Sequence, residues 1–348
     1  MLSEMKRNNF LAMCFGLSLC LALIPLFEVT LTLFWKNETP AGTVYAENYF
    51  FKDSHGIIKP LPNGRYRSVS RRKKNGSLIY DVIYSIDKYS RRIAPALNKE
   101  SRVNDAIFFG CSFTYGEGLQ DDQSIPARFA ARAPAFMPYN YAFHGGSAAD
   151  MLTKLKSGTL KGEIPEKNGA LVYIFIDAHI QRVIGSMSVA GSWGKEHPYY
   201  DLNSKDAVID KGDFLTGRPF LTHLYIILSK SKLINFFKID FPLRLSSRNI
   251  HLTARVIEES FRAYKEQFPA GHFYVVIYPG SLQGKFLIPE LSKMGIETVD
   301  YSGLINVRDM RYVLAPEDLH PSALAADKIG GQLALDIDVR YGKMPKSI

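Results

Sequence analysis

The sequence predicts an α/β protein with a doubly wound, parallel five-stranded sheet, and the pattern of apolar segments is the main reason. Beyond residue 103, short and continuously apolar runs alternate with longer segments of helical periodicity. Strands that are apolar throughout are typical of a parallel sheet covered by helices on both faces. This alternation favours one main domain over residues 101–345. The strands are expected at 106–109, 139–143, 171–176, 273–278 and 297–299, and the helices at 124–133, 148–157, 253–268, 283–294 and 322–337.

The size and composition of the chain fit this fold and exclude one class of partner. The chain has 348 residues, enough for one large α/β domain with an appendage, and its 46% hydrophobic and 22% charged residues are ordinary for a globular protein. The net charge is +9, but much of the basic excess lies between Arg65 and Lys74, and no nucleic-acid-binding motif accompanies it. We therefore expect no nucleic-acid partner. The basic stretch is either a solvated hairpin or a contact for an anionic glycan or lipid headgroup.

The N-terminal segment predicts a membrane anchor. Residues 10–35 are mostly apolar and exceed the roughly 20 residues that a transmembrane helix needs. Lys6 and Arg7 favour a cytoplasmic N-terminus over residues 1–9, with the rest of the chain on the periplasmic (extracytoplasmic) side of the inner membrane. Glu28, inside the apolar segment, could contact a membrane partner that supplies acyl groups. A cleaved signal peptide is the alternative.

Two further segments flank or interrupt the main domain. Residues 36–100 are expected to form a small β-rich appendage, in which Asn75-Gly76 favours the type I′ turn of a hairpin between 65–74 and 77–86. Residues 185–250 interrupt the alternation of strands and helices, so we expect an insertion or cap there. Its apolar run, Leu221–Phe237, is interpreted as a buried cap helix, or alternatively as a substrate lid or a surface that rests on a bilayer.

Two short motifs predict the chemistry. Residues 106–118 describe a buried strand that enters a glycine turn and presents Ser112, and Asp318-Leu319-His320-Pro321 follows about two hundred residues later. A hydroxyl, a base and an acid are the three groups that a hydrolytic nucleophile needs. His320 would take the proton of Ser112, and Asp318 would orient the imidazole, with Glu317 as the alternative acid. In the competing interpretation Ser112 only caps the following helix and His320 is an ordinary loop residue.

These motifs resemble the sequence blocks of the SGNH (GDSL-type) serine hydrolases. The run Gly110-Cys111-Ser112-Phe113-Thr114-Tyr115-Gly116 is similar to the first block, with Cys111 in place of the usual aspartate. Asn140 and Gly145 have the spacing of the second block, and Asp318 to His320 has that of the last. The resemblance covers about residues 103–337. It implies a flavodoxin-like fold and a serine esterase or O-acyltransferase, and exported, anchored relatives imply acetyl esters of a cell-surface polysaccharide as substrate.

The resemblance also implies an oxyanion hole, and this chain departs from the family there. The N–H groups of Ser112 and Gly145 would face the developing negative charge. The third block normally contains Gly-x-Asn-Asp, but this chain has Phe175-Ile176-Asp177-Ala178-His179. An ionised Asp177 only accepts hydrogen bonds, so either Asp177 is protonated or His179 supplies the donor. Loss of one such donor typically costs about 2.7–4 kcal/mol of transition-state stabilisation.

Three functions are compatible with these residues. The first is a serine esterase or O-acyltransferase that acts on the acyl groups of a glycan. The second is a non-catalytic glycan-binding or scaffold protein with the same fold, which the departure at Asp177 favours. The third is a lipase-like hydrolase with Leu221–Phe237 as its lid. The sequence has no CxxC motif and no ligand set with zinc-like spacing, so neither a metal nor a cofactor is expected.

Overall fold

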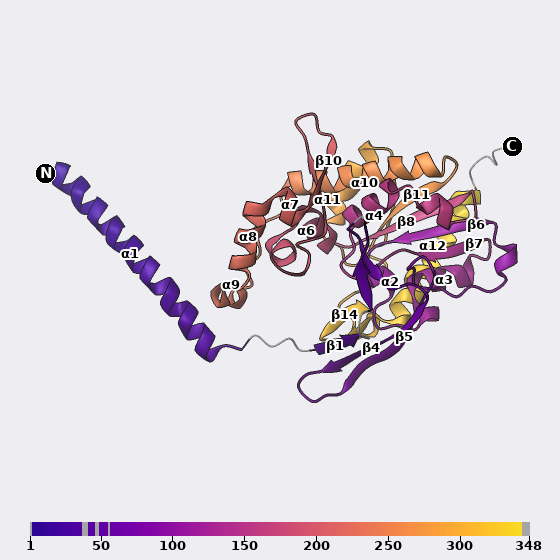
Figure 1. Ribbon diagram of the computed structural model, residues 1–348, viewed down its shortest axis with the longest axis horizontal. Helices are drawn as coiled ribbons and strands as arrows, with labels where there is room; N and C mark the ends of the chain where they lie inside the picture. Colours follow the sequence, from indigo (N-terminus) through magenta and orange to yellow (C-terminus); the bar gives the residue numbers. More distant parts are fainter. Residues whose placement is uncertain (1, 37–40, 46–48, 55, 343–348) are drawn as a thin grey trace.

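A parallel sheet forms the centre of the molecule. The structure, a computed structural model, describes residues 2–36, 41–45, 49–54 and 56–342 (Figure 1), so residue 345, the expected end of the main domain, lies outside the described residues. Five parallel strands confirm the predicted fold class. In spatial order they are β12 (Glu297–Asp300), β11 (His272–Ile277), β8 (Gly169–Phe175), β6 (Asn104–Phe109) and β7 (Phe136–Asn140).

The strand order reverses once, and this reversal determines where a site can form. Counted along the chain from β6, the order across the sheet is 2-1-3-4-5, which is the flavodoxin-like arrangement. The chain therefore passes from β6 to β7 on one side and then crosses to β8 on the other. In open sheets of this kind, ligands bind at the carboxyl ends of the strands beside the reversal. Ser112 follows β6 and Gly145 follows β7, so both lie at this edge.

Helices cover both faces of the sheet, and the alternation of side chains along β8 shows why. Leu171, Tyr173 and Phe175 point into the hydrophobic cluster beneath one layer of helices, and Val172 and Ile174 point into the opposite cluster. All five are buried, because neither face of the strand meets water. Figure 1 shows α10 on one side of the sheet and α12 on the other. The first layer contains α4 (Ala148–Lys156), α10 (Ser247–Gln267) and α11 (Gly284–Lys293), and the second contains α3 (Ile125–Arg132) and α12 (Ala323–Gly342).

The segment before the main domain forms a small antiparallel sheet, but its hairpin turn differs from the expectation. A type I′ turn needs positive φ angles at both central residues, and of Asn75 and Gly76 only the glycine has one, at 69°. The Asn75 side chain instead accepts a hydrogen bond from the Ser77 N–H at 3.1 Å, so the predicted type I′ turn is wrong. The strands are β1 (Ala41–Tyr45), β4 (Gly64–Arg72) and β5 (Leu78–Ile86), and β2 (Phe50–Lys52) pairs separately with β3 (Ile58–Pro60).

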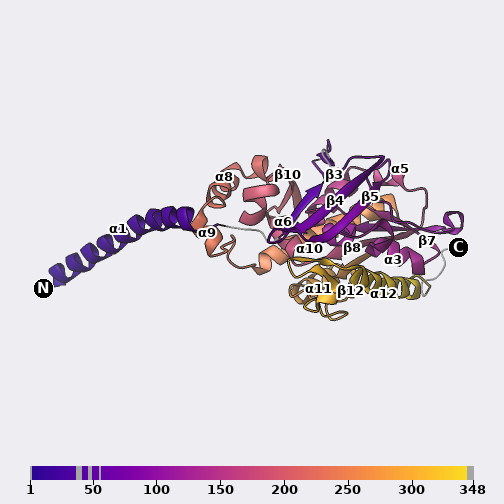
Figure 2. The same ribbon diagram turned by 90° about the horizontal axis from the view of Figure 1, so that it is seen from below.

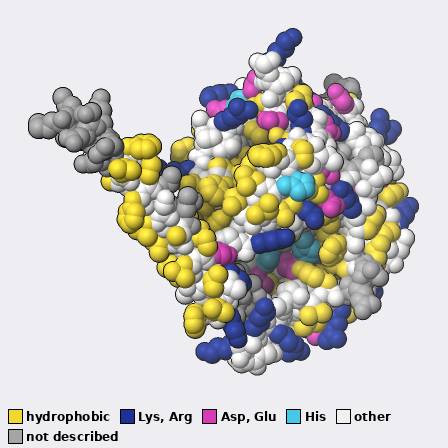
Figure 3. All heavy atoms as spheres, turned by 60° about the vertical axis from the view of Figure 1, so that its left-hand side comes forward, with side chains coloured by type: hydrophobic (Ala, Val, Ile, Leu, Met, Phe, Trp, Pro, Cys, Tyr) yellow, Lys and Arg dark blue, Asp and Glu magenta, His cyan; other side chains and the backbone are white. Residues whose placement is uncertain are grey.

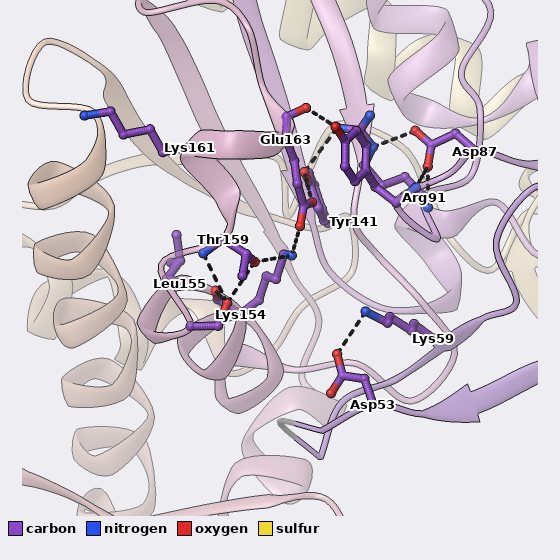
Figure 4. A network of polar contacts seen from close by, with 12 residues as sticks. Asp53, Lys59, Asp87, Arg91, Tyr141, Lys154, Leu155, Thr159, Lys161 and Glu163 are labelled. Carbon is purple, nitrogen blue, oxygen red and sulfur yellow. Dashed lines mark hydrogen bonds and ion pairs between the residues drawn. The ribbon is translucent and has the colours of Figure 1, made fainter.

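A polar network ties this appendage to the main domain (Figure 4). Arg91, just after β5, donates to the Asp87 carboxylate at 2.7 Å and to the Tyr141 hydroxyl at 3.1 Å. Tyr141 in turn donates to the Glu163 carboxylate at 2.7 Å, which also receives a hydrogen bond from Lys154 of α4. Burial lowers the pKa of Lys154 although it is paired with Glu163. The network therefore joins the end of the appendage to the helix that follows β7.

The insertion differs from the single buried helix expected over 221–237. Two helices form there, α8 (Pro219–Leu228) and α9 (Lys232–Phe236), and Ser231 caps the second by accepting from the Ile234 N–H at 3.2 Å. Phe220 is 85% exposed and Ile227 is 68% exposed, so the expectation of a buried cap helix is wrong for α8. The other elements between β8 and α10 are α6 (Ala178–Ile184), a π-helical turn at Val189–Trp193, the paired strands β9 (Pro198–Leu202) and β10 (Val208–Asp213), and α7 (Phe214–Gly217).

The N-terminal segment is one helix, α1 (Leu2–Phe34), which extends away from the rest of the structure (Figure 2). Most of the hydrophobic side chains described on it are exposed (Figure 3). In the described part of the chain, no helix, α1 included, combines the length and the apolarity that crossing a membrane requires. The expected anchor over residues 10–35 and the expected single-pass localisation in the inner membrane are therefore wrong. Glu28 interrupts the apolar segment, and its carboxylate accepts hydrogen bonds from Ser231 and from the N–H groups of Lys232 and Leu233 at the start of α9.

Candidate active site

The turn after β6 presents Ser112 at the edge of the sheet. Gly110 adopts φ 155°, and a Cβ atom there would lie 2.2 Å from the Thr114 hydroxyl, so the turn requires glycine. The chain then enters α2 (Ser112–Tyr115), with Ser112 as its first residue. The first residue of a helix has no intrahelical acceptor for its N–H, so this group points out of the helix end. The turn therefore places a hydroxyl and a backbone donor side by side.

Ser112, His320 and Asp318 form one chain of hydrogen bonds. The His320 Nε2 atom lies 2.8 Å from the Ser112 Oγ atom, and its Nδ1 atom lies 2.6 Å from an Asp318 carboxylate oxygen. The acid and the histidine both belong to β14 (Asp318–Pro321), which pairs with β13 (Val313–Ala315). Because Asp318 accepts the proton on Nδ1, the Nε2 lone pair faces the serine hydroxyl. This is the arrangement in which a histidine removes a proton from a serine.

The alternative acid, Glu317, points elsewhere. Its carboxylate accepts a hydrogen bond from the Arg72 side chain of β4 at 3.2 Å. The structure thus brings Asp318, and not Glu317, to the imidazole. Glu317 lies in the turn between β13 and β14, whereas Asp318 is the first residue of β14, and their carboxylates have different partners.

The backbone around Gly145 lies beside the nucleophile turn and is shaped by two side chains. Gly145 adopts φ 74°, and a Cβ atom there would lie 2.5 Å from the ring of Trp193. Arg182 donates to the Gly146 carbonyl at 2.9 Å, which holds this loop from α6. Within the described residues, neither the Ser112 N–H nor the Gly145 N–H donates to a backbone carbonyl or a side chain. Both N–H groups are therefore available to a ligand.

Asp177 has a different environment from the one predicted for an oxyanion residue. Its two carboxylate oxygens accept hydrogen bonds from the Ser281 hydroxyl at 2.5 Å, from the Leu282 N–H at 2.8 Å and from the Gln283 N–H at 3.1 Å. These contacts fix the turn after β11. A carboxylate occupied in this way provides no donor toward Ser112. The oxyanion role suggested for Asp177 stays a prediction.

His179 lies in the hydrophobic core rather than at the open edge. It is fully buried, and its Nδ1 atom lies 2.7 Å from the Tyr173 hydroxyl. Burial, with a smaller contribution from the charge of Arg182, holds the pKa of His179 well below its usual value, so the ring is neutral. In the part of the chain that the structure describes, its Nε2 atom has no hydrogen-bond partner. The oxyanion role suggested for His179 stays a prediction.

A second acid–histidine pair behind the nucleophile was not identified from the sequence. Glu117 is 2% exposed, and its carboxylate lies 2.9 Å from the His144 Nδ1 atom and 2.9 Å from the Tyr45 hydroxyl, with Tyr80 as a further donor. Burial would raise the pKa of Glu117, but the charge and hydrogen bond of His144 and the Tyr80 hydroxyl together lower it to about 2. The sequence did contain a signal for Glu117. This charged residue stands between two glycines directly after the nucleophile block, in Gly116-Glu117-Gly118.

The site contains no evident metal centre. Among residues 2–342, as far as they are described, no group of three or more histidine, cysteine, aspartate or glutamate side chains is arranged to hold a metal ion. Cys111 is buried beside Ser112, where it occupies the position of the usual aspartate of the first block. The groups that the structure brings together at this edge are the side chains of Ser112, His320 and Asp318 and the loop that carries Gly145.

In comparisons with known proteins, this chain is similar to solved structures but matches no sequence family. No family model and no curated protein matches the sequence. A member of the lipolytic protein G-D-S-L family from Veillonella parvula is similar in structure, with 12% identity, a TM-score of 0.38, and coverage of 68% of this chain and 98% of its own. An acetyl xylan esterase, Est2A, from Butyrivibrio proteoclasticus has 8% identity, a TM-score of 0.40 and coverage of 80% and 69%.

A third similar structure is a family two carbohydrate esterase from Clostridium thermocellum in complex with cellohexaose. It has 10% identity and a TM-score of 0.40, and the match covers 73% of this chain and 68% of that one. These identities and TM-scores are low, so the function of this chain has to be inferred from the geometry of its own site.

Proposed function

We propose that this chain is a serine esterase of the SGNH type, which cleaves an ester through an acyl-enzyme on Ser112. The observation that carries the proposal is the chain of hydrogen bonds from Asp318 through His320 to Ser112, with heavy-atom distances of 2.6 and 2.8 Å. A buried serine that only capped a helix would not need an oriented imidazole at its hydroxyl. The position at the carboxyl ends of parallel strands also favours a reaction site.

The mechanism follows from the position of each group. The Ser112 Oγ atom attacks the ester carbonyl carbon while His320 Nε2 takes the serine proton, and Asp318 stabilises the resulting imidazolium. The negative charge moves to the carbonyl oxygen, where the N–H groups of Ser112 and Gly145 stabilise it. The bond to the alcohol oxygen then breaks, and that oxygen receives the proton from His320. Water, deprotonated by His320, attacks the acyl carbon and releases the carboxylic acid and free Ser112.

For the alcohol portion of the ester we propose a sugar. Trp193 is 50% exposed and its ring lies against Gly145, so it offers a flat apolar face at the edge of the reaction centre. Exposed tryptophan beside polar groups is suited to a ligand that has both apolar C–H faces and hydroxyl groups. If a sugar hydroxyl rather than water attacks the acyl-enzyme, the same site performs O-acyl transfer. Hydrolysis and transfer thus share every step up to the acyl-enzyme.

The deciding experiment measures hydrolysis of a chromogenic acetate ester by the full chain, together with its Ser112→Ala and His320→Ala variants. We expect both variants to lose about 10³-fold or more of kcat, because each removes a member of the triad. A fluorophosphonate probe should label wild type on Ser112 and leave Ser112→Ala unlabelled. Circular dichroism serves as the control for folding. Equal background rates in all three proteins would favour the competing non-catalytic glycan-binding function.

A further inference from the structure

An apolar pocket of about 270 Å³ lies beside the triad and has no function in the mechanism above. It opens at the carboxyl ends of β8 and β11, on the side of Ser112 opposite to Gly145. Its residues come from five separate parts of the chain: the nucleophile turn, the end of β8, the end of β11, the segment that leads into β13, and β14. The side chains that form its apolar wall are Phe113, Ile176, Tyr278, Val307, Tyr312 and Leu319.

Two of the wall residues are the direct neighbours of catalytic residues. Phe113 follows Ser112, and Leu319 precedes His320. The ring of Phe113 packs edge-on against Tyr278, with 5.1 Å between ring centroids, and it also contacts the His320 imidazole at 5.2 Å. Through Phe113, the wall of the pocket therefore reaches the imidazole that is hydrogen-bonded to Ser112. Such a position is suited to part of the substrate rather than to a distant regulator.

We propose that this pocket binds the acyl chain of the substrate and that the chain is longer than acetyl, about four to eight carbons. The inference rests on the proposed esterase function. An apolar cavity of about 150 Å³ holds benzene, and a molecule of water occupies about 30 Å³, which is close to the size of one methyl group. A pocket of about 270 Å³ would be mostly empty around an acetyl methyl. Burial of each further methylene strengthens binding by about fourfold, so a longer chain binds better by filling the pocket.

The acyl portion fits this pocket better than the alcohol portion. The alcohol oxygen must lie near His320 Nε2 to receive its proton, and a sugar beyond it carries hydroxyl groups that need partners. The pocket wall provides mainly phenyl, phenol and aliphatic groups, and the carboxylate of Asp177 at its edge is already occupied by the 281–283 turn. An unbranched acyl chain needs no hydrogen bonds. The sugar is then left on the opposite side, where Trp193 lies.

The other cavity near the nucleophile turn is less suited to an acyl chain. It is lined by Gly110, Phe143 and Ser147, but its volume is only about 40 Å³, which is close to the space of one or two water molecules. Charged residues of the appendage and of α4, namely Asp53, Lys59 and Lys154, also line it. A hydrocarbon chain there would bury these charges in an apolar surrounding, which is unfavourable.

The test compares hydrolysis of p-nitrophenyl esters from acetate to decanoate by the full chain. We expect kcat/KM of the wild type to be highest between butanoate and octanoate. Val307→Phe should fill the pocket and lower the octanoate-to-acetate ratio of kcat/KM by about tenfold or more, and Val307→Ala should move the optimum to longer chains. The matched control is Val339→Phe, which places the same ring on the exposed side of α12 and should leave the chain-length profile unchanged.

The outcomes separate this inference from the function on which it rests. A wild type that prefers acetate, with a profile that neither Val307 variant alters, would overturn the acyl pocket and leave the esterase function intact. A second series varies the alcohol, from methyl to octyl acetate. If the Val307 variants change selectivity in that series only, the pocket binds the alcohol and the inference is wrong. No turnover of any ester by the folded wild type would overturn the esterase function and the acyl pocket together.

Discussion

At the scale of single residues, the neighbouring carboxylates of Asp318 and Glu317 have different partners. Asp318 accepts from His320 Nδ1, whereas Glu317 accepts from Arg72 across the boundary with the appendage. We expect Asp318→Asn to lower kcat for a chromogenic ester by about 10³- to 10⁴-fold, because the uncharged amide neither stabilises the imidazolium nor holds the required tautomer. Steady-state kinetics on the purified variant measures this effect.

The matched control for Asp318→Asn is the same change one position earlier. Glu317→Gln removes a charge from a partly exposed ion pair, and such changes usually alter free energies by no more than about 0.5 kcal/mol, so kcat should stay within about threefold of the wild type. Equal losses in the two variants would show that Asp318 has no special function. A larger loss of kcat in Glu317→Gln than in Asp318→Asn would identify Glu317 as the catalytic acid.

A second residue, Asp105 at the start of β6, predicts a dependence of stability on pH. Its carboxylate is fully buried, and neither oxygen has a hydrogen-bond partner within the described chain. Burial, followed by the nearby charge of Glu166, raises its pKa to about 7. The folded protein therefore keeps a proton that the unfolded chain releases near pH 4. Consequently, Asp105 should lower the free energy of unfolding progressively as the pH rises from about 4 to about 7.

The variant Asp105→Asn removes this titration and keeps the shape of the side chain. We expect its advantage over the wild type in the free energy of unfolding to grow by about 2–3 kcal/mol between pH 5 and pH 8, measured by urea denaturation. Asp338→Asn on the exposed side of α12 is the control. An advantage of Asp105→Asn that did not change with pH would contradict the raised pKa.

At the scale of elements, Glu28 of α1 provides hydrogen bonds to the start of α9. The Glu28 carboxylate accepts from the Ser231 hydroxyl at 2.8 Å and from the N–H groups of Lys232 and Leu233 at 2.5 and 3.0 Å. These hydrogen bonds, that of Leu233 first, lower the pKa of Glu28. Glu28 therefore satisfies N–H groups at the start of α9 that the short helix cannot satisfy itself.

The expected consequence concerns the amide protons of α9. Glu28→Gln should accelerate hydrogen exchange at Lys232 and Leu233, because an amide is a weaker acceptor than a carboxylate. Thr30→Ala is a suitable control, because the Thr30 hydroxyl donates to the Leu26 carbonyl of its own helix. Unchanged exchange rates in Glu28→Gln would contradict a function of Glu28 in holding α9.

The elements of the main sheet could be predicted from the sequence because each is a continuous apolar run. The strand expected at 139–143 shows the limit of this reasoning, since β7 spans Phe136–Asn140 and the apolar residues after it belong to the loop that carries Gly145. In that loop, burial comes from the rings of the appendage, which lie about sixty to ninety residues away in sequence. Sequence periodicity indicates which side of a single helix or strand is apolar. It does not indicate which residues, distant in sequence, pack against that side.

The same argument applies to the site. The proximity of Ser112, Asp318 and His320 was predictable, because short motifs mark these residues. The chemical environment of Glu117 and Asp177 was not, because their partners, Tyr45 and Tyr80 for the first and residues 281–283 for the second, are far away in sequence. The exposure of α8 was equally unpredictable, because the amino-acid pattern of an apolar run does not depend on whether another element packs against it.

At the scale of the whole molecule, the appendage and the main domain share one core around the nucleophile helix. Tyr49 and Tyr84 of the appendage pack against Tyr115 and Phe143, with 5.1 Å between the ring centroids of Tyr84 and Tyr115. The fully buried guanidinium of Arg92 donates to the carbonyls of Tyr115, Gly116 and Leu119 at 2.9, 2.6 and 2.6 Å. These contacts hold the end of α2 and hence the position of Ser112.

We therefore expect the appendage and the active site to unfold together. Tyr84→Ala removes a fully buried ring and should lower the free energy of unfolding by about 3–5 kcal/mol, with esterase activity and the circular dichroism signal lost at the same urea concentration. Ile83→Ala is the control, because Ile83 lies on the exposed face of the same strand and should change stability by about 1 kcal/mol or less. If the dichroism signal of Tyr84→Ala fell in two steps, with activity surviving the first, the appendage would be a separate folding unit and Ser112 would not depend on its aromatic cluster.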